Sequence, residues 1–183
     1  MSAAVGVPTD APARDDRVLP VTRRVAWIIV PFLAAAFLVL YGVPGRTTEF
    51  FAWTIRPDMT PILMGAGYGA GVYFFYRVAT GEEWHRVAGV FPGIGVFTWF
   101  MAAATVLHWE NFNHGHYTFV LWVVLYAVTP LLVPAVWWVN RRTARASSAD
   151  DIRLPRAVRL AGGGMALPVT VGAAVLFVDP GPM

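Results

Sequence analysis

Five apolar stretches, each long enough to cross a bilayer, occupy most of this 183-residue chain. They cover residues 25–43, 59–76, 87–107, 118–139 and 160–178. An α-helix rises 1.5 Å per residue, so about 20 apolar residues span a hydrocarbon core of ~30 Å. None of the five stretches contains an Asp, Glu, Lys, Arg or His. The pattern therefore predicts an all-α fold, a polytopic bundle of five transmembrane helices.

Composition supports this class and excludes others. Hydrophobic residues make up 57% of the chain and charged residues 14%, whereas an ordinary soluble domain carries about 25% charged residues. The absence of cysteine excludes disulfides and thiolate metal ligands. The net charge of +3 comes from arginines that cluster between the apolar stretches, so we expect no basic surface for nucleic acid. Arginine without lysine, together with the many Ala, Gly and Val residues, indicates a high-GC bacterial genome.

The arginines also predict an orientation. All but two of the 14 basic residues lie before the first stretch, between the second and third, or between the fourth and fifth; the exceptions are Arg46 and Arg56. Positive residues concentrate in cytoplasmic loops. We therefore predict a multi-pass protein of the bacterial plasma (inner) membrane, with a cytoplasmic N-terminus and an external C-terminus. Residues 1–23 lack apolar periodicity, which predicts a disordered cytoplasmic tail ahead of a transmembrane domain over residues 24–183.

Small residues mark the second stretch as a packing helix. Its glycines recur at a spacing of four, as the pairs Gly65 with Gly69 and Gly67 with Gly71. Glycines at this spacing let two helix backbones approach closely, and such packing replaces the hydrophobic drive that lipid removes. We expect these glycines to pack against another helix of the same chain. A seam between two copies of the chain is the alternative.

The loop between the first two stretches carries an aromatic motif. It contains Phe50, Phe51, Trp53, Pro57 and Asp58. Its aromatic residues are expected to lie in the membrane interface on the outer side. Asp58 stands where it could cap the second helix. We therefore single out Trp53, Pro57 and Asp58 as the outer-loop motif.

The other outer loop holds three of the four histidines. His108, His114 and His116 lie close to Glu110. Neutral imidazoles bind Zn²⁺ and Cu²⁺, so these four residues form a candidate metal site. Their spacing matches no standard zinc pattern, and histidines beside aromatic residues also serve as interfacial polar groups. We expect the structural role and no cofactor, with a zinc or copper ion as the alternative.

The segments that precede the first and fifth stretches are alike. Residues 19–26 and 154–161 both read Leu-Pro, three residues, Arg, an aliphatic residue and Ala. Membrane proteins often contain such repeats. The pattern predicts an internal duplication that is truncated after its second copy begins.

Two further segments carry a resemblance. Residues 51–57, continuing into Met59, Thr60 and residues 65–68, resemble a group of uncharacterised actinobacterial membrane proteins. A second shared stretch comprises His108, Phe112, Trp122, Tyr126 and Pro130. The resemblance covers roughly residues 24–142. It implies several membrane-spanning helices and more chain after the fifth, and it implies no known activity.

The lack of charge within the stretches bears on function. Ion and proton pathways in membranes usually contain buried acidic or basic residues, so the sequence disfavours a proton-coupled pump. We expect a non-catalytic membrane component, either a small carrier for a neutral solute or an accessory subunit. The alternative is a membrane-embedded enzyme or metal-binding protein that uses the outer His/Glu loop. The expected partners are the lipid bilayer and either a second copy or another subunit of a membrane complex.

Overall fold

A computed structural model describes residues 16–144, and within them it contains helices and no strand longer than an isolated bridge. The all-α prediction is therefore confirmed. The elements are α1 (Pro20–Gly42), η1 (Pro44–Arg46), α2 (Thr47–Phe50), α3 (Met59–Thr80), α4 (His85–Ala88), α5 (Phe91–Leu107), η2 (Trp109–Asn111) and α6 (Tyr117–Thr143). The predicted fifth helix at 160–178 and the second copy of the repeat lie outside the described residues.

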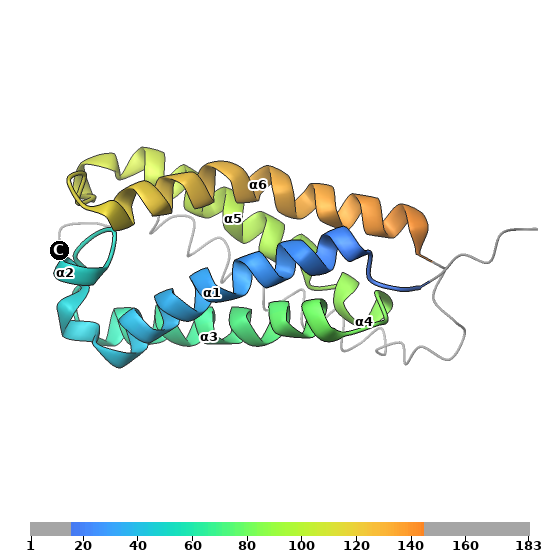
Figure 1. Cartoon of the computed structure of the whole chain (residues 1–183). Coiled ribbons are helices and arrows are strands. Elements are labelled where there is room, and N and C mark those ends of the chain that lie inside the picture. Colours follow the sequence, from blue (N-terminus) through green and yellow to red (C-terminus); the bar gives the residue numbers. More distant parts are fainter. Residues whose placement is uncertain (1–15, 145–183) are drawn as a thin grey trace, which may run out of the picture. The chain divides into compact units, whose positions relative to one another are not determined.

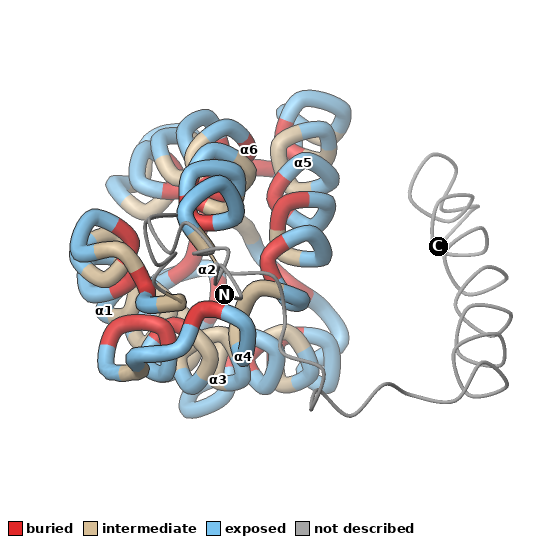
Figure 2. The backbone as a smooth tube through the Cα atoms, turned by 90° about the vertical axis from the view of Figure 1, so that its right-hand side faces the viewer, coloured by how far each residue is buried: buried red, intermediate tan, exposed pale blue. Residues whose placement is uncertain are grey.

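The four long helices form two antiparallel pairs. Helix α1 lies along α3, and α5 lies along α6 (Figure 1). We call the end at which α1 begins the inner end and the opposite end the outer end, after the predicted topology. Buried residues lie mainly on the facing sides of the helices, and exposed residues lie mainly on their outer sides (Figure 2).

Three segments are long and apolar enough to cross a membrane: Pro20–Gly42, His85–Leu107 and Tyr117–Thr143. Helix α3 has 22 residues, but its glycines and tyrosines make it less apolar than the other three. Large apolar side chains such as Leu38, Leu63 and Leu131 point outward. This distribution is expected where lipid surrounds the helices. The chain is a membrane protein.

Local chemistry explains where the helices depart from the predicted ranges. Pro20 occupies the first turn of α1, where its missing N–H costs nothing. The predicted helix at 87–107 is divided into α4 and α5, because Pro92 in the first turn of α5 cannot donate to the preceding turn. Helix α6 runs on to Thr143, and Arg141 and Arg142 lie over the rings of Trp137 and Trp138.

The prediction of a disordered tail is wrong for residues 16–23, whereas residues 1–15 lie outside the described part. Val18 is buried, and its N–H donates to the Glu82 carbonyl at 2.9 Å. The Trp84 N–H donates to the Asp16 carbonyl at 2.7 Å. The segment is ordered because its backbone pairs with the loop between α3 and α4 and because Val18 enters the core.

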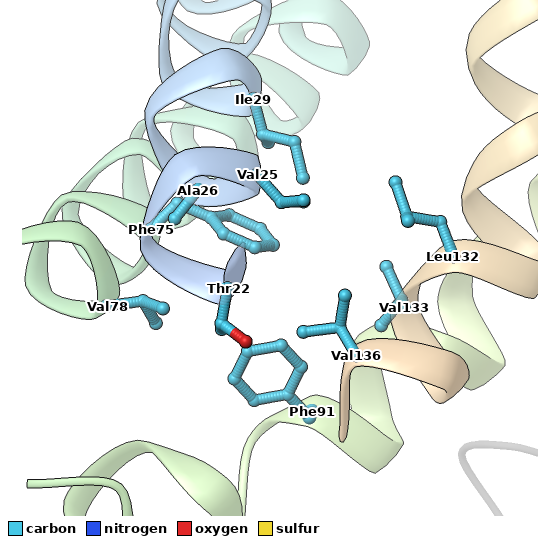
Figure 3. A pocket seen from close by; sticks show the side chains of 10 residues that line it. All are labelled: Thr22, Val25, Ala26, Ile29, Phe75, Val78, Phe91, Leu132, Val133 and Val136. Atoms are coloured by element: carbon cyan, nitrogen blue, oxygen red, sulfur yellow. The ribbon is translucent and has the colours of Figure 1, made fainter. Parts of the chain in front are cut away.

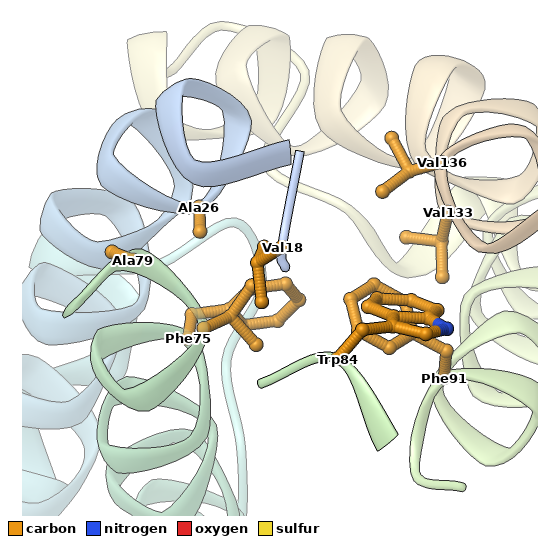
Figure 4. Packing of buried hydrophobic residues seen from close by; sticks show 9 residues of the cluster. Val18, Ala26, Phe75, Ala79, Trp84, Phe91, Val133 and Val136 are labelled. Carbon is orange, nitrogen blue, oxygen red and sulfur yellow. The ribbon is translucent and has the colours of Figure 1, made fainter. Parts of the chain in front are cut away.

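Two separate hydrophobic clusters hold the helix pairs together. The inner core, shown in Figure 4, comprises Val18, Ala26, Phe75, Val78, Ala79, Trp84, Phe91, Val133 and Val136. The outer core comprises Leu40, Phe51, Ala52, Ile55, Phe112, Phe119, Trp122 and Tyr126. Each cluster draws residues from both pairs, so the bundle is joined at both ends.

Three of the four glycines in α3 face α1. A Cβ added at Gly65 would lie 2.8 Å from the Tyr41 backbone N. At Gly69 it would lie 3.1 Å from the Phe37 ring, and at Gly71 it would lie 3.2 Å from Leu33 Cδ1. At Gly67 none of the described residues lies within 4 Å of an added Cβ, so the predicted packing is not found there within residues 16–144. Because a helix has 3.6 residues per turn, Gly67 falls on another side of α3 than Gly65 and Gly69.

Candidate functional site

The two predicted outer loops meet at the outer end. Trp53 pairs with Phe112 in an isolated antiparallel bridge, and the Asn113 N–H donates to the Ala52 carbonyl at 2.8 Å. The Trp53 ring lies 5.1 Å from the Phe112 ring and 4.7 Å from the Trp122 ring, centroid to centroid. Trp53 thus joins the first loop to the second loop and to α6. We call this aromatic closure the outer cap.

The other two motif residues lie beside the cap. Pro57 follows a cis peptide bond, and its carbonyl accepts from the Thr60 N–H at 2.9 Å. Asp58 holds the N-cap position of α3, but its side chain makes no capping hydrogen bond. Both residues shape the entry into α3.

The four candidate metal ligands, His108, Glu110, His114 and His116, do not converge on one point in the structure. His108 follows α5, Glu110 lies in η2, and His116 caps α6 with its Nδ1 accepting from the Thr118 N–H at 3.4 Å. The His114 ring packs between Trp109 and Phe119, at centroid distances of 5.3 and 4.8 Å. Over residues 16–144, no three His, Asp or Glu side chains come together as metal ligands would.

A metal assay tests the alternative directly. We expect protein purified without a histidine tag to contain zinc and copper well below one ion per chain, because the imidazoles contact aromatic rings and helix ends. Elemental analysis of the parent and of the His114→Ala/His116→Ala variant measures this. Stoichiometric metal in the parent that disappears in the variant would refute the structural role.

A pair of tyrosine hydroxyls lies between the two helix pairs. The hydroxyls of Tyr68 on α3 and Tyr126 on α6 are 3.1 Å apart. At 1.5 Å per residue, each tyrosine lies about 14 Å along its helix from the outer end, and half a hydrocarbon core is ~15 Å. Tyr126 is 8% exposed, and the centroid of its ring lies 4.2 Å from that of Trp122, with the two rings tilted by 46°. A hydrocarbon core of ~30 Å that began at the outer ends of these helices would have its midplane at the depth of this pair.

Uncharged polar groups continue from this pair toward the outer end. The Trp122 indole N–H donates to Thr105 Oγ1 at 2.9 Å. The Thr105 hydroxyl in turn donates to the Met101 carbonyl at 2.7 Å. These groups satisfy one another within the bundle, as buried polar groups must in a membrane.

A small apolar cavity lies on the same helix faces, closer to the inner end (Figure 3). Phe75 follows Tyr68, and Val133 follows Tyr126, each by about two helical turns, so each partner shares its tyrosine's face. The cavity has a volume of about 10 Å³ and is lined mainly by Val25, Ile29, Phe75, Val133 and Val136, with the Thr22 hydroxyl as a polar group. It has room for about one water molecule.

A buried asparagine closes the inner end. Asn140 is 1% exposed, and its Oδ1 accepts from the Leu19 N–H at 3.1 Å. Its Nδ2 donates to the Thr22 hydroxyl and to the Val136 carbonyl, the latter at 2.7 Å. We call these contacts the inner clip, because they tie the start of α1 to the end of α6.

The sequence analysis did not single out these groups as a site. Tyr68 and Tyr126 lie within apolar stretches and belong to the two segments of the resemblance, but neither was assigned a role. Their central position is a further signal, since tyrosine usually lies near membrane interfaces. Asn140 follows the last residue of the predicted fourth helix and was placed in a loop. In each case the information missing from the sequence was which helix faces meet.

Comparison with known proteins found no matching family model, no similar curated protein and no similar solved structure.

Proposed function

We propose that the protein is a non-catalytic carrier for a neutral solute in the bacterial plasma membrane. The observation that supports this is the Tyr68–Tyr126 hydroxyl pair, which lies near the midplane between two helix pairs. Solute sites of many transporters lie at this depth between structural units. The hydroxyls are neutral, as are Trp122 and Thr105 beside them, so the site suits an uncharged molecule.

The arrangement of the bundle supports a carrier cycle. The outer cap and the inner clip close the two ends, while the cavity between them is small. Uptake of a solute larger than water requires the two helix pairs to move apart at one end while the other stays closed. A carrier alternates between two such states.

Solute flux into proteoliposomes tests the proposal. Stopped-flow light scattering would follow re-swelling of vesicles after an osmotic step with a panel of neutral alcohols, amides and ketones. We expect faster entry of at least one class than in protein-free vesicles, and slower entry for the Tyr68→Phe/Tyr126→Phe variant. Equal rates with and without protein across the panel would refute the carrier.

The orientation is tested separately with reporter fusions. A reporter that is active only in the cytoplasm should be active when fused after Thr143 and silent when fused after Asn113. The arginine distribution supports this outcome. The reverse pattern would place the outer cap in the cytoplasm.

An accessory subunit is the second candidate. Trp99 lies midway along α5 and is 55% exposed, and its indole N–H makes no hydrogen bond within the part of the chain that the structure describes. An indole N–H in hydrocarbon lacks an acceptor, so this side chain favours contact with another membrane protein. A complex of fixed stoichiometry that survives purification in mild detergent and is lost in Trp99→Leu would support this candidate.

A further inference from the structure

We infer that the Tyr68–Tyr126 pair is a hydrogen-bond donor site for the carbonyl oxygen of an apolar, uncharged molecule such as a long-chain ketone. This inference rests on the proposed function and names its solute class. The first argument is a count of donors. Each tyrosine hydroxyl carries one hydrogen, and the contact between the two hydroxyls uses one of the two. Among residues 16–144 neither hydroxyl makes a second hydrogen bond, so one O–H remains available.

The surroundings favour a carbonyl as the acceptor. A buried donor without a partner costs about 1–3 kcal/mol, and a carbonyl satisfies it without adding another donor. The neighbouring polar groups are already engaged, because Thr105 accepts from Trp122 and donates to Met101. A charged oxygen is disfavoured, since the site contains no cation and lies deep in the bundle.

The same helix faces also offer an apolar surface for the rest of such a ligand. The cavity beside Phe75 and Val133 lies about 10 Å along the helices from the tyrosines, at 1.5 Å per residue. Apolar side chains of α1, α3 and α6 line it. Met64 and Met101 pack against the outer core, and methionine side chains adapt readily to a new neighbour. A ligand whose carbonyl lies at the tyrosine pair would thus extend its hydrocarbon chain toward the inner core as the helix pairs separate.

Three ligands of equal length test this chemistry. Tritiated 2-undecanone offers a carbonyl, 2-undecanol offers a hydroxyl and undecane offers neither. Binding to purified protein is measured by scintillation proximity, with protein-free micelles as the reference. We expect 2-undecanone to bind at least tenfold more tightly than undecane. Equal affinities for the two, or tighter binding of 2-undecanol than of 2-undecanone, would overturn the inference.

The tyrosine variants separate a ligand role from a structural one. Each single variant, Tyr68→Phe or Tyr126→Phe, removes the contact between hydroxyls but keeps one O–H, so 2-undecanone affinity should change less than threefold. The double variant should lose about tenfold, while undecane binding stays the same. A purely structural pair would show its whole effect in the single variants. Tyr73→Phe, at a side chain that is 65% exposed, is the matched control.

A spectroscopic readout covers the case in which the double variant fails to fold. The stretching band of carbonyl-labelled 2-undecanone should move to lower wavenumber in the parent protein relative to micelles, and an unmoved band would refute the hydrogen bond. The flux assay remains independent of these measurements. Flux of other solutes without ketone preference would refute only the carbonyl inference, whereas ketone binding without any flux would refute only the carrier.

Discussion

Replacing Asn140 with leucine will lower the free energy of unfolding by about 3 kcal/mol, because three hydrogen bonds disappear and buried partners remain unsatisfied. The substitution nearly preserves volume, so the effect comes from the lost amide. The Leu19 N–H loses its acceptor, and the Thr22 hydroxyl loses its donor. Denaturation of the purified protein in mixed micelles measures the change.

The control for this variant is Thr143→Ala. Thr143 lies one turn beyond Asn140 on α6, and its hydroxyl bonds only to carbonyls of its own helix, at 2.9 and 3.4 Å. Its loss should cost less than about 0.5 kcal/mol, as exposed substitutions usually do. A loss of less than about 0.5 kcal/mol for Asn140→Leu as well would show that the inner clip contributes little to stability.

Gly65→Ala will destabilise the bundle by about 2–3 kcal/mol, whereas Gly67→Ala will be neutral or stabilising by up to about 1 kcal/mol. The added methyl at Gly65 would lie 2.8 Å from the backbone N and 2.9 Å from the Cβ of Tyr41. Neither atom can rotate away, so α1 and α3 must separate. At Gly67 the methyl would meet none of the described residues within 4 Å, and alanine favours the helix. Thermal denaturation of both variants in one detergent makes the comparison.

Gly69→Ala provides an intermediate case. Its added methyl would meet the ring of Phe37 at 3.1 Å, and a ring can shift where a backbone cannot. We expect a loss between those of the other two variants. Equal melting temperatures for Gly65→Ala and Gly67→Ala would mean that the face of α3 bearing Gly65 does not pack against α1.

The sequence predicts the helices well because an apolar stretch of this length can adopt few other backbone conformations in a membrane. The ends were less predictable. Asn140 and the arginines after it look like a loop, yet α6 continues because Asn140 is satisfied by Leu19 and Thr22. Residues 16–23 look like a tail in isolation, and only their pairing with the loop before α4 orders them.

The site was less predictable than the fold for a similar reason. Trp53 stood out as an interfacial aromatic and Phe112 as part of the resemblance, but their pairing depends on two loops that are distant in sequence. The glycine spacing indicated a packing face, but it could not show that a Cβ added at Gly71 would meet Leu33 whereas one at Gly67 would meet none of the described residues. The tyrosine pair depends on the register of α3 against α6, which no local pattern encodes.

The pairing of neighbouring helices also determines the order in which the molecule can assemble. Helices α1 and α3 can form their glycine seam as soon as both have left the ribosome, before α5 and α6 are made. The inner clip joins residues 121 positions apart, so it must close last. Asn140→Leu should therefore leave the membrane insertion of the α1–α3 hairpin unchanged and impair only its packing against the α5–α6 hairpin.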